Sequence, residues 1–154
     1  MKSHFLSKAL LISMFCTGVM QTANAADAIS AEMTVLKVQA DKKIALKLTD
    51  QVEPKDVLEY TVAYNNVSVH TLKDVRLNLP IPAHVTYTGK ALLAPTYASI
   101  DGVNFAKAPL MRLENGKQVQ IPFSEYRALQ WEIKTFKPKQ HVKVSAQVRV
   151  NSAE

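Results

Sequence analysis

Apolar and polar side chains alternate along most of the chain after residue 32. The clearest case is Val142–Val150, where valines and an alanine alternate with polar residues such as Lys143 and Arg149. A period of two over nine residues places one face of a strand in the core and the other in water. Weaker or shorter runs repeat the pattern at 33–39, 44–48, 58–64, 75–79, 85–87 and 129–133. The alternation predicts an all-β protein.

Turn-forming residues separate these runs. Asp101-Gly102 and Asn115-Gly116 each lie between β-prone segments, and both dipeptides are typical of tight type I′ hairpins. Strands spaced by about 8–12 residues with such turns between them predict a sandwich or a barrel. We expect seven to nine strands in a single domain over residues 33–154. Ser124 offers a helix cap before Trp131, but strict alternation favours a strand over 129–133.

The first 25 residues have the three parts of a secretory signal peptide. Lys2 and Lys8 give a basic start, residues 9–20 are almost uncharged and apolar, and Ala23-Asn24-Ala25 supplies small residues for cleavage. The apolar run is shorter than the roughly 20 residues of a transmembrane helix, and no second run follows. The sequence therefore predicts cleavage after Ala25, a flexible segment over 26–32, and a periplasmic or secreted product without a transmembrane segment.

The net charge indicates which partners the mature chain favours, and the cysteine content indicates how that chain is stabilised. The chain has 19 basic and 13 acidic residues, and loss of Lys2 and Lys8 leaves the mature form at about +4. This mild basicity favours anionic envelope polymers, lipid head groups or acidic proteins, and no nucleic-acid motif is present. The one cysteine, Cys16, lies in the predicted signal; lipoprotein anchoring through it is the alternative, disfavoured by the large Phe15. The mature chain is expected to hold together by core burial.

One segment, Pro54–Leu92, resembles a known family. It is similar to the bacterial and archaeal surface-protein repeat known as a domain of unknown function, the eleventh of its series. The residues that carry the resemblance are Pro54-Lys55-Asp56, Tyr60, Asn66, Ser68, Ile81-Pro82 and Val85-Thr86-Tyr87, then Trp131–Pro138 and Val142–Val150. Lys55, Ser68 and Lys139 stand where the family has glycine, Leu79 stands where it has aspartate, and residues 93–128 lie outside the match. The resemblance implies an immunoglobulin-like antiparallel β-sandwich at the cell surface and no reaction.

No catalytic, metal-binding or cofactor-binding residues are predicted. The three histidines after the signal, His70, His84 and His141, lack the spacing of metal ligands and are expected in turns or facing solvent. No G-x-S-x-G sequence seats a nucleophile. The lone tryptophan, Trp131, is expected between the sheets.

Basic residues gather in the last two predicted strands and the turn between them. They are Lys134, Lys137, Lys139, Lys143 and Arg149. If these strands pair, alternation places the five on one sheet as a positive stripe that contacts an anionic partner. The alternative is a solvated strand face whose lysines deter edge pairing.

The leading hypothesis is a non-enzymatic binding or structural module of the envelope, whose partner is an envelope protein or an anionic surface polymer. A subunit of a surface assembly that exchanges the 33–39 strand, and an enzyme of unrecognised type, remain as alternatives. The oligomeric state stays open.

Overall fold

The computed structural model describes residues 28–40, 42–47 and 50–152. The predicted signal peptide over residues 1–25 and its cleavage site lie outside these ranges. Eleven strands and a short 3-10 helix, η2 (Phe123–Glu125), make up the described chain. The strands are β1 (Ile29–Gln39), β2 (Lys42–Ala45), β3 (Val57–Asn66), β4 (Leu72–Pro80), β5 (Val85–Ala91), β6 (Tyr97–Ser99), β7 (Ala106–Lys107), β8 (Met111–Glu114), β9 (Lys117–Gln120), β10 (Ala128–Phe136) and β11 (His141–Val150).

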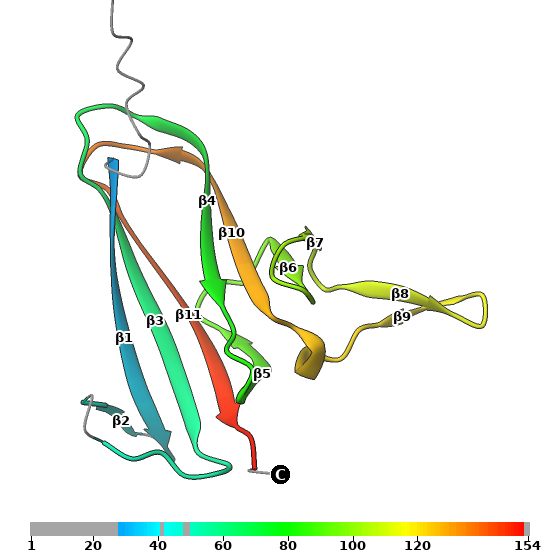
Figure 1. Ribbon diagram of the computed structural model, residues 1–154. Helices are drawn as coiled ribbons and strands as arrows, with labels where there is room; N and C mark the ends of the chain where they lie inside the picture. The colour runs from blue at the N-terminus through cyan, green and yellow to red at the C-terminus, as the bar shows by residue number, and fades with distance from the viewer. Residues whose placement is uncertain (1–27, 41, 48–49, 153–154) are drawn as a thin grey trace, which may run out of the picture.

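Two antiparallel sheets face each other and confirm the predicted all-β sandwich. The five-stranded sheet has the order β2-β1-β3-β11-β5, and the four-stranded sheet has the order β4-β10-β6-β7. The β8–β9 hairpin projects away from both sheets (Figure 1). There are more strands than the seven to nine expected, because β2, β6 and β7 span only two to four residues each. β2 overlaps the alternating run expected over 44–48, whereas β6 and β7 carry too few alternating positions to show a pattern.

The core lies between the inner faces of the two sheets. From β11 come Val144, Ala146 and Val148, all with no exposed surface, and from β10 come Leu129 and Trp131. Trp131 is 2% exposed, as expected of a core residue, and its indole Nε1–H donates to the Leu93 carbonyl at 2.9 Å. Burial of each such valine or leucine side chain stabilises the fold by about 1.5–3 kcal/mol.

Asn66, at the end of β3, forms hydrogen bonds to two segments through which the chain passes from one sheet to the other. Its side chain is 1% exposed. The Nδ2 amide donates to the carbonyls of His70 and Phe136, both at 2.8 Å, and Oδ1 accepts from the Ser68 N–H and hydroxyl. One side chain thus joins the β3–β4 connection to the end of β10, and both of these segments carry the chain from one sheet to the other.

The N-terminal segment corrects one prediction. Residues Ile29–Glu32, expected to be flexible, form the first part of β1 and pair with β3 from Asn66 to Ala63. The backbone ladder supplies hydrogen bonds that the weak apolar pattern of Ile29, Ser30 and Ala31 does not reveal, because ladder formation depends on the neighbouring strand.

The two predicted hairpin turns behave differently. Asn115 and Gly116 have φ values of 51° and 77°, which confirms the type I′ turn between β8 and β9. The turn predicted at Asp101-Gly102 is wrong, since β6 and β7 are joined by a six-residue loop and only Gly102 has positive φ. The Asp101 carboxylate instead accepts hydrogen bonds from the backbone N–H groups of Val103 and Asn104. Side-chain bonding of this kind replaces the tight turn.

We expect Asn66→Ala to lower the free energy of unfolding by about 1–3 kcal/mol, because the buried Phe136 carbonyl and the β3–β4 connection lose their partner. Denaturant titration measures this. The neighbouring Asn65→Ala serves as control: its side chain lies on the outer face of β3, and its replacement should cost less than about 1 kcal/mol. Equal losses in the two variants would show that Asn66 has no special part in the fold.

Candidate functional site

The five predicted contact residues do not share one sheet. Lys134 lies on β10 in the four-stranded sheet, whereas Lys143 and Arg149 lie on β11 in the five-stranded sheet. The prediction of a stripe on a single sheet is therefore wrong. The physical reason is the connection between the two strands: residues 137–140 carry the chain across the sandwich, so β10 pairs with β4 and β6 while β11 pairs with β3 and β5.

The Lys134 ammonium forms ion pairs with two acidic neighbours. Its ammonium lies 2.9 Å from a Glu132 carboxylate oxygen and 3.2 Å from one of Asp74. Hydrogen bonds to Glu132 and then Asp74 raise the pKa of Lys134. Lys137 and Lys139 lie exposed in the connection, and Lys139 has a φ of 60°. These three residues are therefore separated from the other two, which face a hollowed surface.

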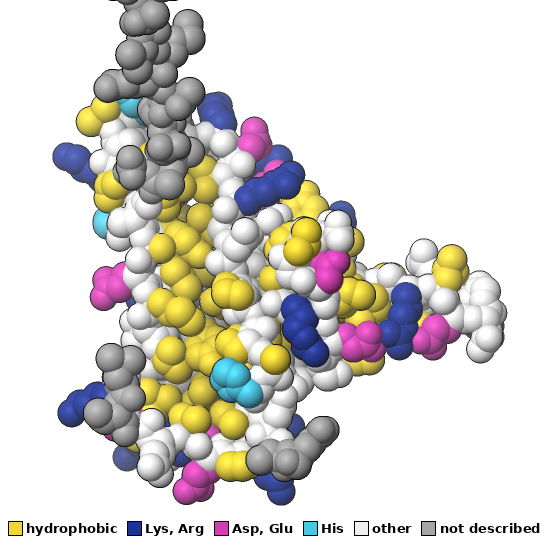
Figure 2. All heavy atoms as spheres, viewed as in Figure 1, with side chains coloured by type: hydrophobic (Ala, Val, Ile, Leu, Met, Phe, Trp, Pro, Cys, Tyr) yellow, Lys and Arg dark blue, Asp and Glu magenta, His cyan; other side chains and the backbone are white. Residues whose placement is uncertain are grey.

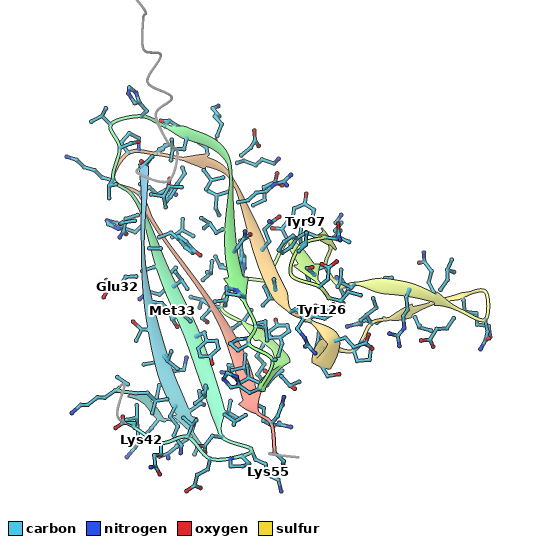
Figure 3. The ribbon with its side chains drawn as sticks, viewed as in Figure 1. Glu32, Met33, Lys42, Lys55, Tyr97 and Tyr126 are labelled. Atoms are coloured by element: carbon cyan, nitrogen blue, oxygen red, sulfur yellow. The ribbon has the colours of Figure 1, made fainter. Side chains whose placement is uncertain are left out.

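The outer face of the five-stranded sheet carries a row of hollows that share wall residues, called here the outer groove. It consists of four neighbouring hollows of about 480, 170, 330 and 990 Å³. Successive hollows share wall residues: Glu59 lines the first and second, Gln147 the second and third, and Arg149 the third and fourth. Glu32 lines the first hollow and Lys55 the last, and Figure 3 shows these two residues well apart along the sheet.

Strand alternation explains why this face is hollow. One row of outward positions across β1, β3 and β11 holds the small side chains of Thr34, Thr61 and Ser145, and Ala63 lies next to this row on β3. Longer side chains border the hollows on both sides, Lys43 from β2 and Leu92 from the segment after β5. Small residues between longer ones produce a trough across the sheet.

Glu59 is the acid at the centre of the outer groove. It is 8% exposed, and its carboxylate accepts from the Lys43 ammonium at 2.9 Å and from the Gln147 amide at 3.2 Å. Burial alone would raise the pKa of Glu59, but the bonds from Lys43 and Gln147 outweigh burial and hold that pKa below its usual range. Glu59 is therefore ionised at neutral pH, and it neutralises Lys43.

Four further cations line the outer groove without an acidic partner in the described part of the chain. They are Lys55, Lys90, Lys143 and Arg149. Glu32 is the second acid on the lining, so five cations face two carboxylates. The backbone N–H of Lys55 donates to the Val150 carbonyl, which holds Lys55 beside the end of β11. The outer groove is positively charged as a whole.

No aromatic side chain of the described residues forms the floor of the outer groove. The aromatic residue on its lining, Tyr87, is 3% exposed, and its ring packs in the core against Phe123 and Tyr126. The arrangement therefore offers charge and polar hydrogen-bonding groups rather than stacking surfaces. Across residues 28–40, 42–47 and 50–152 no three His, Cys, Asp or Glu side chains come together as metal ligands. The same ranges contain no helix of the length and apolar content needed to cross a membrane.

Sequence reasoning found Lys143 and Arg149 but missed Lys43, Lys55, Glu59 and Lys90. The alternation in β3 does predict an outward Glu59. Nothing local in the sequence indicates that β2 and β5 bring their lysines to the same face, because that depends on which strands become neighbours.

Comparison with protein-family models, with curated proteins and with solved structures finds no significant match for this chain. The resemblance to the surface-protein repeat therefore stays a prediction.

Replacement of Lys43 by alanine should raise the pKa of Glu59, because burial then acts with less opposition. Carboxyl NMR titration measures the change. Lys42→Ala, on the opposite face of the same strand, should leave that pKa unchanged. Ionised Glu59 stabilises the fold above its unfolded pKa, near 4.5, and this stabilisation is lost as pH falls through the lower folded value. A Glu59 pKa that is identical in the wild type and Lys43→Ala would contradict the assignment.

Proposed function

We propose that this protein is an exported, non-enzymatic binding module of the cell envelope that holds an extended anionic polymer in the outer groove. The observation that carries the proposal is the row of four cations that have no acidic partner among the described residues, along neighbouring hollows that share wall residues. The predicted signal peptide over residues 1–25 supports the exported setting.

The dimensions of the outer groove suit a chain better than a compact ion. Lys143 and Arg149 are six residues apart on β11, which corresponds to about 20 Å along a strand. Lys90 lines the hollows that lie between them. A polymer with repeated carboxylate or phosphate groups would meet several of these cations at once, and such multivalent contact raises affinity beyond that of one ion pair.

The lining also favours charge over sugar stacking as the basis of recognition. Hydroxyl and amide groups of Thr34, Thr61, Thr88 and Gln147 border the groove and can hydrogen-bond to a polar chain. Neutral sugars are commonly held through aromatic faces, which the floor does not provide. We therefore expect an acidic polysaccharide to bind and a neutral one of equal length to fail.

A pair of charge-reversal variants tests this proposal. Lys90→Glu, Lys143→Glu and Arg149→Glu together should weaken binding of polygalacturonate about tenfold or more, because three favourable ion pairs become repulsive. The matched control reverses Lys134, Lys137 and Lys139, which changes the net charge by the same amount away from the outer groove. Isothermal titration at low and high salt measures both, and wild-type affinity should fall as salt rises.

Two outcomes would contradict the proposal. An equal loss of affinity in both triple variants would mean that net charge alone attracts the polymer. Equal binding of dextran and polygalacturonate by the wild type would mean that charge is not what the protein recognises.

A further inference from the structure

The first half of β1 has a partner on one side only. β2 pairs with β1 over Leu36–Gln39, and β3 pairs along the other edge of β1. Over Ile29–Thr34, the edge turned away from β3 meets no strand among the described residues. This stretch is called here the free edge.

The hydrogen bonds around β1 show which backbone groups face the free edge. The Leu46 N–H donates to the Val35 carbonyl on the β2 side, and the Val67 N–H donates to the Ala28 carbonyl on the β3 side. Backbone groups of successive residues in a strand point to alternate sides. The N–H and C=O groups of the odd-numbered residues Ile29, Ala31 and Met33 therefore point outward from the free edge.

Unlike the free edge of β1, the edge strand β4 of the other sheet is protected against pairing with a further strand. Lys73 and Arg76 place charges along β4, Asp74 interrupts it with a φ of 49°, and the Tyr64 hydroxyl donates to its Asn78 carbonyl. Charged residues and local irregularity are the usual means by which proteins block edge-to-edge association.

The free edge of β1 has almost none of these features. Its six residues include one charge, Glu32, and no proline or positive φ. Met33 is 54% exposed on the inner face of β1, opposite in direction to Glu32 (Figure 3). Apolar side chains gather on the surface between β1 and β4 in Figure 2.

We propose that two copies of this chain associate by antiparallel pairing of their free edges, with Ala31 opposite Ala31 of the second copy. The local two-fold axis of such a pair stands perpendicular to the sheet, so outward residues of one copy face outward residues of the other. Ile29 then lies opposite Met33 of the second copy, and Ser30 lies opposite Glu32. The outward groups of Ile29, Ala31 and Met33 in the two copies form six backbone hydrogen bonds.

Two other registers, centred on Glu32 and on Met33, are less favourable. Centring the pair on Glu32 would place two like charges directly opposite each other, which is destabilising. Centring it on Met33 would require the Val35 carbonyl, which already accepts from Leu46. The register centred on Ala31 avoids both conflicts. It also joins the two five-stranded sheets, so that both outer grooves open on the same side. This association goes beyond the proposed function and stands without it.

Single-cysteine crosslinking tests the register. In the full chain carrying Cys16→Ser, Ala31→Cys should form an intermolecular disulfide, because opposed Cα atoms would be about 5.5 Å apart. In the Glu32→Cys variant the substituted residues of the two copies would be diagonal neighbours, about 7–8 Å apart. They should therefore form a disulfide much more slowly. Arg76→Cys on the β4 edge is the negative control. Faster crosslinking at position 32 or 76 than at 31 would overturn the proposal.

A proline scan of the two edges tests the association itself. Ala31→Pro removes an N–H that points away from β3 and faces no strand among the described residues, so the fold should persist by circular dichroism. We expect it to lower the association constant measured by sedimentation about tenfold or more. Arg76→Pro makes the matched change on the β4 edge and should leave association unchanged. A wild-type protein that stays monomeric at every concentration, or an Ala31→Pro variant that associates as well as wild type, would overturn the proposal.

Discussion

Pairing between β3 and β11 is the constraint on which both the core and the outer groove depend. Nine residue pairs, from Val57 with Arg149 to Asn65 with His141, hold these strands side by side in the middle of the five-stranded sheet. In this register Val62 and Val144 face the core together, while Ala63 and Lys143 face outward together. A slip of one residue would exchange the faces, so the hydrophobic core fixes the position of the groove-lining side chains.

The distribution of basic residues over the two sheets depends on where the chain crosses from one sheet to the other. Because residues 137–140 leave one sheet for the other, the basic residues near the C-terminus are divided. On the four-stranded sheet Lys134 is neutralised by Glu132 and Asp74. On the outer face of the five-stranded sheet Glu59 neutralises Lys43, and the other cations of the groove form no ion pair with any described residue. Asn66 fixes this crossing through its bond to the Phe136 carbonyl.

Alternation in the sequence was enough to predict most of the long strands, but it does not show which strands lie next to each other in a sheet. The all-β class, the β11 strand, the core position of Trp131 and the Asn115-Gly116 turn follow from period two and from residues that tolerate positive φ. The loop at Asp101 could not be predicted in this way, since side-chain hydrogen bonds to Val103 and Asn104 decide its shape. Two of the positions that the resembled family gives to glycine, Lys55 and Lys139, do have positive φ.

The candidate site was only partly predictable for the same reason. Lys143 and Arg149 could be placed on an outward strand face from their spacing alone. Lys43 and Lys90 join them only because β2 and β5 fold to the two sides of the β1-β3-β11 surface. Sheet order is a property of the whole chain, and no local pattern in a single sequence specifies it.

The proposed binding site for an anionic polymer is the outer groove rather than the basic connection between β10 and β11. The most direct test is an NMR titration of the isotope-labelled protein with polygalacturonate, following each backbone amide. We expect the largest shift changes at Thr61, Lys143 and Gln147, with little change over residues 137–140. Changes concentrated at residues 137–140, with the amides of the outer groove unmoved, would contradict it.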